Sequence, residues 1–303
     1  MAGVLAAGGP WGTALAQSGP APETVRKGSA GGILFRATRG DATVLVYGIL
    51  HVGEESFYPL RPVILQPLRR SQALLVEVDV LAADLPAQFR RYGLLPEGAA
   101  PARIEAAHRV RVDQALRSAG IDPAFAARFK SDVLAAMLAL ASARQLGLTS
   151  EYSVDSFVIG FARALDIPVV EMEGLQRQLT LNDGVPAQDL QGSLDEGVQA
   201  LASGATVRTM ARMVRAWRGN DLDLLSRLYT DANAGSTRER QRRQMAQRNE
   251  AMADFIAGRA AQVRRQFVAV GVFHLVEPAS LQSRLAQRGF AVERVQWSGE
   301  DLQ

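Results

Sequence analysis

Residues 43–51 read TVLVYGILH, and residues 266–274 read QFVAVGVFH. Each stretch is a short apolar run that ends in Gly-x-x-His, a pattern typical of a buried strand with a histidine just beyond its carboxyl end. A stretch with helical spacing follows each histidine, at about 60–71 and 278–288, and Pro278 fits the first turn of the second helix. A further strand comes after each helix. The chain therefore contains two units of the form β–Gly-x-x-His–α–β, which predict an α/β core.

Three more strands complete the predicted sheet. Residues 73–78 (ALLVEV) and 167–172 (IPVVEM) are apolar enough for buried strands. Residues 291–297 (AVERVQW) alternate between apolar and polar side chains, which suits a sheet edge. Residues 85–260 have mostly the three- and four-residue apolar spacing of helices.

These elements predict the fold class and the domain organisation. The class is α/β (α+β), with a central β-sheet built from two pseudo-twofold β–α–β units and a large helical insertion between them. We expect a single domain over residues 33–297, after a signal-like segment and linker at 1–32. The parts of that domain are a core at 33–84 and 266–297 with a central strand near 167–172, and an insertion at about 85–260.

The composition restricts the chemistry that the chain can carry. Of its 303 residues, 48% are hydrophobic and 21% are charged, which is ordinary for a globular protein. There is no cysteine, so a disulfide framework, a thiolate metal site and a cysteine nucleophile are excluded. Chemistry that needs imidazole depends on three histidines, His51, His108 and His274. His108 lies in an arginine-rich helical stretch, where we expect a solvated surface residue.

The N-terminal residues resemble a targeting segment. Residues 4–15 are small and apolar and lead into Ala-Leu-Ala at 14–16, the pattern of signal-peptidase cleavage, and residues 17–32 have the composition of a linker. We therefore expect a periplasmic or secreted protein, with a disordered cytoplasmic leader as the alternative. No later stretch approaches ~18 uninterrupted apolar residues, so no membrane span is predicted.

The basic residues do not predict a nucleic-acid partner. Lys and Arg number 34 against 31 Asp and Glu, a net charge of only +3. Residues 208–265 hold thirteen arginines against six acids, but apolar residues such as Met245 and Ile256 are interleaved at helical spacing. Such a stretch is typical of the solvated face of packed helices. The chain also has no Walker loop, Gly-x-Gly-x-x-Gly, His-Glu-x-x-His or Gly-x-Ser-x-Gly motif.

The two histidines at strand ends predict a metal site. In an open α/β sheet, ligands bind beyond the carboxyl ends of the strands, where His51 and His274 would converge. Imidazole with carboxylate suits Zn, Mn, Co, Fe or Ni. Glu77 lies in an apolar strand, where an unpaired charge is costly, so it needs an ion, an arginine or a proton. Glu54 and Glu277 each follow a histidine by three residues and could be further ligands or a general base.

Each of these residues also has a purely structural interpretation. A histidine at a strand end can simply be hydrogen-bonded within the fold. Arg248 could orient a substrate carboxylate, because arginine binds carboxylates through two parallel hydrogen bonds, or it could form an interhelical salt bridge. Glu171 and Glu173 flank the end of one strand, and either could face the crevice.

The order of the motifs resembles the TraB/PrgY/GumN family, which includes the membrane-tethered metalloproteases of the Tiki branch. The resemblance covers residues 31 to 297. The segments that carry it are GILH (48–51), EVD (77–79), Asp155, PVV (168–170), MEG (172–174) through Gln178, WRGN (217–220), RN (248–249), GVFHL (271–275) and GFAV (289–292).

The resemblance implies a divalent-metal hydrolase, best supported as a peptidase in the Tiki branch. Carried over residue by residue, it implies His51, His274 and Glu77 as the metal centre. The chain departs from the family pattern at Ile49, where threonine is usual, and at Glu277, where many members have glycine. Gly174 also replaces the threonine that usually follows Glu173.

We therefore expect a metal-dependent hydrolase that acts on a peptide or another small molecule and uses Mn, Co or Zn. His51, Glu77 and His274 would hold the ion, Glu54 or Glu277 would serve as base, and Arg248 would orient the substrate. The alternatives are an exported protein that binds a peptide or signal without turnover, and an accessory protein of envelope or polysaccharide assembly. The sequence predicts no oligomeric state.

Overall fold

The computed structural model describes residues 31–232 and 236–297, and residues 1–30 of the predicted signal-like segment and linker (1–32) lie outside them. The strands are β1 (Ile33–Arg39), β2 (Ala42–Ile49), β3 (Ala73–Val76), β4 (Val169–Glu171), β5 (Arg265–Gly271) and β6 (Ala291–Val295). The helices are α1 (Pro62–Arg69), α2 (Leu85–Gly93), α3 (Ala106–Ser118), α4 (Pro123–Ala126), α5 (Ser131–Arg144), α6 (Val154–Ala164), α7 (Leu175–Thr180), α8 (Ala187–Ala202), α9 (Ala205–Arg218), α10 (Leu222–Ala232), α11 (Ser236–Arg259) and α12 (Leu281–Gln287). Two short 3-10 turns are η1 (Glu55–Phe57) and η2 (Val272–Leu275).

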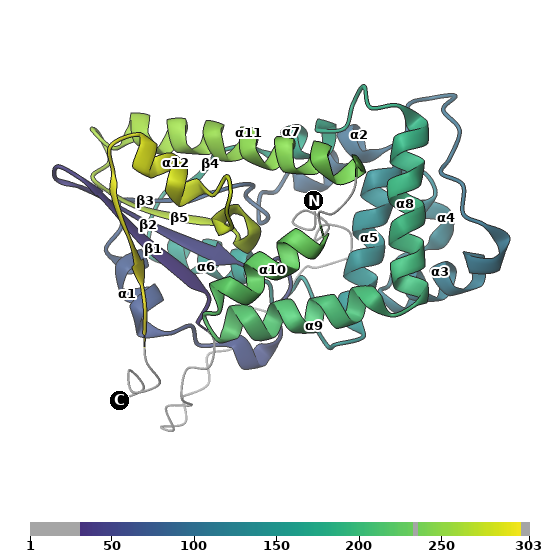
Figure 1. The fold of residues 1–303 in the computed structure, drawn as a ribbon, viewed down its shortest axis with the longest axis horizontal. Helices are drawn as coiled ribbons and strands as arrows, with labels where there is room; N and C mark the ends of the chain where they lie inside the picture. The colour runs from purple at the N-terminus through teal and green to yellow at the C-terminus, as the bar shows by residue number, and fades with distance from the viewer. Residues whose placement is uncertain (1–30, 233–235, 298–303) are drawn as a thin grey trace.

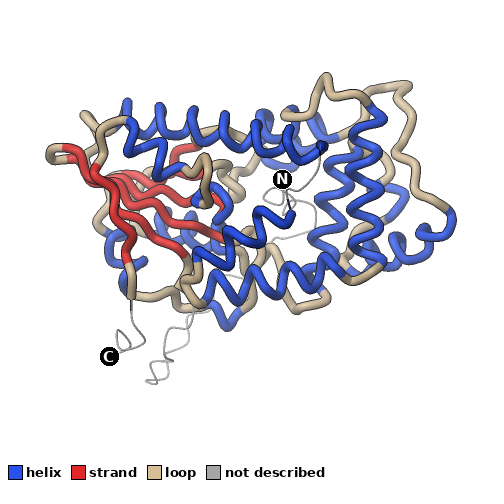
Figure 2. Tube along the Cα trace, in the orientation of Figure 1, coloured by secondary structure: helices blue, strands red, loops and turns tan. Residues whose placement is uncertain are grey.

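The strands form one mixed sheet in the order β4-β3-β5-β2-β1-β6 (Figure 1). The first four strands of this order run parallel to one another, whereas β1 is antiparallel to both β2 and β6. Figure 2 shows the strands at one end of the molecule and a layer of helices that includes α5 and α8 at the other. The chain thus has a mixed α/β fold, as the strand and helix patterns predict.

The sheet contains all five predicted strands and one that the sequence patterns do not predict. The additional strand, β1, forms a hairpin with β2 in which Arg39 pairs with Ala42. Because β1 lies between β2 and β6, the two β–α–β units cross the sheet differently. The first runs from β2 past β5 to β3, and the second runs from β5 past β2 and β1 to β6.

The central strands β2 and β5 bring the two Gly-x-x-His motifs to the same edge of the sheet. Both strands are buried along nearly their whole length, which is typical of parallel strands covered by helices on both faces. They pair in parallel with Ile49 opposite Gly271. The two histidines therefore follow adjacent strand ends.

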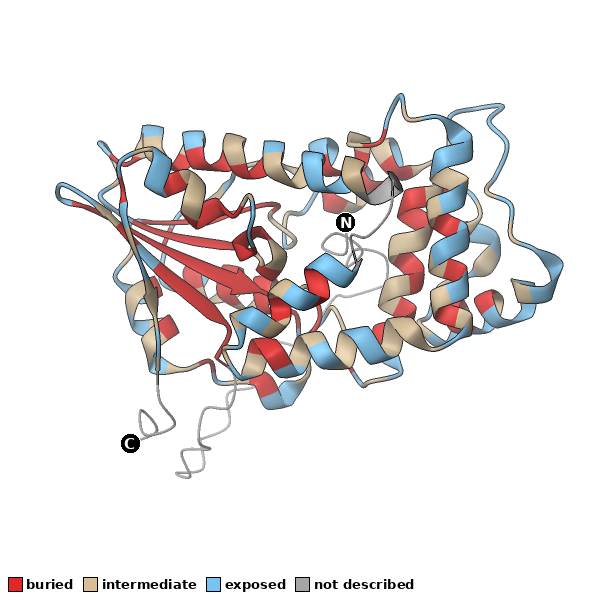
Figure 3. Cartoon of the chain, in the orientation of Figure 1, coloured by how far each residue is buried: buried red, intermediate tan, exposed pale blue. Residues whose placement is uncertain are grey.

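The buried apolar residues form two clusters (Figure 3). One surrounds the sheet, and the other lies among the helices, with members from α2, α3, α5, α7 and α8. Trp217, near the end of α9, is fully buried and donates its indole N–H to the carbonyl oxygen of Gly48 at 2.7 Å. This bond attaches the helical region to the end of β2.

The last helix begins later than the sequence predicts. Pro278 lies before α12 rather than in its first turn, because the Ser280 side chain caps the helix by accepting the backbone N–H of Ser283. A hydroxyl at this position satisfies a helical N–H that would otherwise have no partner. The helix ends before Gly289, whose φ of +80° is a conformation that glycine adopts without strain.

Candidate active site

A cavity of about 520 Å³ lies between the carboxyl ends of β2, β3 and β5 and the helices α5, α8, α9, α10 and α11. Its polar side, here called the floor, is formed by His51, Glu77, Arg248 and His274, together with Gln178. The cavity is therefore where the topology of an open α/β sheet predicts a ligand. The four predicted residues come from β2, β3, α11 and η2 or the positions directly after them.

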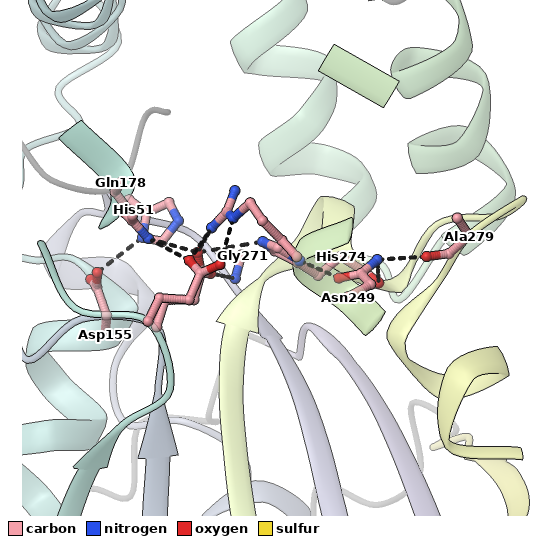
Figure 4. Close-up of polar contacts among 10 residues, drawn as sticks. His51, Asp155, Gln178, Asn249, Gly271, His274 and Ala279 are labelled. Carbon is pink, nitrogen blue, oxygen red and sulfur yellow. Dashed lines mark hydrogen bonds and ion pairs between the residues drawn. The ribbon is translucent and has the colours of Figure 1, made fainter. Parts of the chain in front are cut away.

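His51 is held by Asp155, in the first turn of α6. Its Nδ1 donates to Asp155 Oδ2 at 3.0 Å, so its other ring nitrogen, Nε2, faces Gly271 (Figure 4). A Cβ atom at Gly271 would lie 2.9 Å from this Nε2, so the glycine of the second motif leaves room for the histidine of the first. Burial opposes protonation of the imidazole, but the bond to Asp155 and the charges of Asp155 and Glu77 outweigh it and raise the pKa of His51.

His274 lies in η2 and is held by Asn249 of α11 (Figure 4). The side-chain nitrogen of Asn249 donates to the carbonyl oxygens of Ala279, at 2.6 Å, and His274, at 3.3 Å. Its Oδ1 therefore accepts a hydrogen bond from Nδ1 of His274, which assigns the proton to that nitrogen. Burial lowers the pKa of His274, so the neutral ring presents the lone pair of Nε2 to Glu77 Oε2, 3.4 Å away.

Glu77 directly follows β3 and is bonded from several parts of the chain. Its Oε1 accepts the backbone N–H of Gly271 at 2.5 Å. Its Oε2 accepts hydrogen bonds from Arg248, at 2.6 Å, and from Gln178, at 3.1 Å. Burial alone would raise the pKa of this carboxyl, but the positive charge of Arg248, with a further contribution from His51, holds it well below its usual value.

Arg248 forms a buried salt bridge with two carboxylates. Its Nε and one terminal nitrogen donate to the two carboxylate oxygens of Glu173, at 2.8 and 2.7 Å, and the terminal nitrogen also reaches Glu77. The side chains of Arg248, Glu77 and Glu173 are 8%, 8% and 2% exposed. Of the two alternatives that the sequence leaves open for Arg248, the structure has a salt bridge, but its partners lie just after β3 and β4 and not on a second helix. Of the two glutamates near β4, Glu173 is the one that faces the floor.

The other predicted residues do not line the cavity. Glu54 pairs with Arg218 at 3.0 Å. Glu277 is exposed and accepts hydrogen bonds from the hydroxyls of Ser280 and Ser283 at the start of α12. The 3-10 turn η2 and the residues after it carry Glu277 away from His274, although the two are only three positions apart. His108 bonds Gln199 on α8, apart from the cavity.

The floor supplies the kinds of atom that a divalent ion prefers. In both histidines an oxygen acceptor fixes Nδ1, as is usual for metal-binding histidines. Nε2 of His51 faces Gly271, whose N–H binds Glu77, and Nε2 of His274 faces Glu77 itself. Nε2 of His274 and Oε2 of Glu77 are both acceptors, so a cation would relieve their close approach. Within residues 31–232 and 236–297, however, no three His, Asp or Glu side chains are grouped closely enough to hold a metal ion. The donor atoms of these residues are of the kinds that a divalent ion binds. In this structure, however, the carboxylate of Glu77 is bonded to Arg248.

Sequence reasoning names Asp155 and Gln178 only as positions of the family resemblance and considers Asn249 only beside Arg248 as a clamp for a substrate carboxylate. It predicts none of their contacts with the floor residues, although all three are buried. Asn249 carries a detectable signal, since it is a polar residue on a helix that packs apolar side chains such as Met252 against the sheet. Asp155 lies two residues after Ser153, which caps α6, so a helix-start pattern locates it without indicating its partner.

No helix in the described part of the chain is long and apolar enough to cross a membrane. The sequence model of the TraB/PrgY/gumN family matches residues 33–294. The chain is 28% identical over 247 residues to the uncharacterized protein YbaP of Escherichia coli strain K12, covering 78% of this chain and 86% of that protein. The YbaP protein of Shigella flexneri, also uncharacterized, matches with the same identity and coverage. No solved structure matches the chain at a significant level.

Proposed function

The chain belongs to the TraB/PrgY/gumN family, and from this premise we propose that it is a divalent-metal-dependent hydrolase that cleaves peptides. The observation that carries the proposal is the pair of histidines at adjacent strand ends. An oxygen acceptor holds Nδ1 of each, and Nε2 of each faces the floor beside Glu77. Two imidazole nitrogens and a carboxylate are thus available on one side of the cavity, and these are the kinds of donor that a hydrolytic metal site uses.

His51, His274 and Glu77 would hold the ion, with Mn, Co or Zn as candidates. When bound, such an ion polarises a carbonyl group and lowers the pKa of water. Asp155 and Asn249 fix the two imidazoles in the tautomer that leaves Nε2 free. The proposal gives Glu54 and Glu277 no part in the reaction, because neither lines the cavity.

Arg248 has a different role in the proposal from orienting substrate. It holds Glu77 as a carboxylate, in a salt bridge that also includes Glu173. The pKa of Glu77 is well below its usual value, so the carboxylate is charged and can act as a ligand at neutral pH. The N-terminal sequence pattern supports export of the enzyme, and we place its reaction in the periplasm or outside the cell.

Metal content provides the direct test. The protein is stripped with chelator, dialysed against Mn, Co or Zn, and analysed for bound metal by plasma mass spectrometry. We expect one ion per chain, and loss of that ion in His51→Ala and in His274→Ala. His108→Ala is the matched control, because it removes the third histidine, which bonds Gln199 outside the cavity. Stoichiometric metal in either of the first two variants would refute the site.

Cleavage is tested separately with a peptide library. We expect the loaded protein to cleave at least one peptide, the activity to disappear with chelator, and His108→Ala to retain it. A protein that binds its ion but cleaves nothing in the library would contradict the hydrolase proposal while leaving the metal site intact.

A second candidate is a binding protein without turnover, and the Arg248 salt bridge favours it. This residue already bonds the carboxylate of Glu77, so the fold holds that carboxylate in place without an ion. In this case, ligand binding in the cavity would survive treatment with chelator, and no peptide would be cleaved.

A further inference from the structure

We propose that the helix-lined side of the cavity is a binding subsite for an apolar chain attached to an uncharged amide. The apolar chain would be a hydrophobic side chain of a peptide or the acyl group of an N-acyl amide. This inference rests on the proposed function and adds to it the class of substrate.

Outside the floor, the lining of the cavity, here called the wall, is mostly apolar, and its uncharged polar members are Thr206 and Thr209 of α9. It is formed by side chains from α5, α9, α10 and α11, including Leu140, Met210, Met213, Leu228 and Met245. The charged residues of the cavity outside the floor, Arg212 and Asp231, are exposed to solvent. A pocket with apolar walls and a few polar groups at one end is the usual form of a small-molecule site.

Three of the seven methionines of the chain lie in this wall. Met210 and Met213 are one helical turn apart on α9, and Met245 lies on α11. None of the three is fully buried, so each keeps surface that a ligand could cover. Methionine is unbranched and polarizable and adapts to apolar groups of different shape, so the wall suits a range of hydrophobic chains.

The charge of the floor selects against anions. Arg248 donates to Glu77 and Glu173, and Asp155 adds a third carboxylate beside His51. The floor thus has two carboxylates bonded to one guanidinium and a third carboxylate behind His51. Without an ion, this surplus of negative charge would repel a carboxylate or phosphate, and a bound divalent ion would leave the charges of the floor close to balanced, so that no anion is needed to complete them. The group that reaches the floor is therefore uncharged, as an amide is.

The size of the cavity requires more than an ion and water. A water molecule occupies roughly 30 Å³ of liquid volume. The cavity of about 520 Å³ is many times larger and falls within the range of roughly 300 to 1,000 Å³ for ligand pockets. The volume that an ion and its water would leave free lies against the wall, where an apolar chain would displace water.

Binding and cleavage of matched ligands test the inference. The metal-loaded full chain is titrated calorimetrically with acetyl-Ala-Ala-X-Ala-Ala-amide, where X is Ala, Leu, Met, Phe or Asp, and with acetyl- and octanoyl-Ala-Ala-amide. We expect Leu, Met or Phe at X, or the octanoyl group, to bind at least about tenfold tighter than Ala or acetyl, and Asp to bind most weakly. Preference within the peptides identifies a side chain as the apolar group, and preference for octanoyl identifies an acyl chain.

Two substitutions connect this preference to the wall. Met213→Glu places a charge among apolar side chains and should remove the preference, and Met213→Ala should reduce it. Val110→Glu, at a 66% exposed position on α3, is the control that should leave it unchanged. Circular dichroism checks that each variant is folded, and Met213→Ala decides the question if Met213→Glu does not fold.

The result that would overturn the inference is affinity equal within about twofold across all ligands, or a preference that is undiminished in Met213→Ala. Failure of the hydrolase proposal gives a different result, because apolar ligands would then bind with the expected preference and remain uncleaved. Cleavage without any preference would support the hydrolase and refute the subsite.

Discussion

Replacement of Arg248 by alanine tests how the floor of the cavity is stabilised. The substitution removes three short hydrogen bonds, two to Glu173 and one to Glu77, and leaves both carboxylates without a cation. Glu77 keeps the hydrogen bonds from Gly271 and Gln178, so its negative charge is still partly stabilised. Among the described residues, the side chain of Glu173 keeps only a hydrogen bond from Gln178, at 3.2 Å.

The expected loss of stability follows from burial. The arginine and both carboxylates are at most 8% exposed, so solvent screens their interactions little. Removal of one partner from a buried ion pair typically costs about 3–5 kcal/mol, because an uncompensated charge remains in the interior. We expect a loss in this range, which corresponds to a melting temperature lower by about 6–10 °C at roughly 2 °C per kcal/mol for a large domain.

Urea unfolding followed by circular dichroism, in chelator at neutral pH, measures this loss. The matched control is Arg36→Ala, which removes an equally short ion pair, of 2.8 Å, with Glu293. The control pair is 48% and 64% exposed, so its removal should cost less than about 1 kcal/mol. Equal losses in the two variants, or a loss below about 1 kcal/mol in Arg248→Ala, would refute the role given to burial here.

Two further predictions concern His51. Gly271→Ala would place a Cβ atom 2.9 Å from Nε2 of His51, so urea unfolding should show a loss of stability of about 1–3 kcal/mol. The control is Gly160→Ala, which has open space around it and should cause no such loss. Equal stability of the two variants would contradict the close approach. Asp155→Asn should lower the pKa of His51 in an NMR titration, and an unaltered pKa of His51 would exclude Asp155 as the cause of its raised value. Because the folded pKa of His51 is raised, its stabilising effect is fully present below the usual value of 6.5 and disappears as the pH rises through the folded pKa, so Asp155→Asn should cost most at acidic pH.

The strands and the convergence of His51, Glu77 and His274 were predictable because local patterns determine them. Apolar runs locate the buried strands, and the rule that ligands bind beyond parallel strand ends brings their last residues together. The strand β1 was not predicted, although residues 33–39 are mostly buried in the structure. Its place between β2 and β6 depends on pairing with strands that lie both next to it and far along the chain.

The pairing of side chains was less predictable than their approximate location. The sequence left Arg248 with two alternatives because nothing local indicates that α11 passes over Glu77 and Glu173. The spacing of Glu277 from His274 suggested proximity, but Ser280 and Ser283 bind its carboxylate at the start of α12. Such contacts depend on how helices pack in three dimensions, which spacing along the sequence does not determine.

The bonds to Glu77 also have a consequence for the order of folding. The carboxylate is bound by Gln178, Arg248 and the backbone of Gly271, which are 101, 171 and 194 positions away in the chain. Contacts between such distant residues form slowly, since large loops must close before any of them can be made. The complete floor can therefore assemble only after both the helical region and β5 have taken their places. A nascent or partly folded chain would lack the complete floor, so any function of the cavity depends on the finished fold.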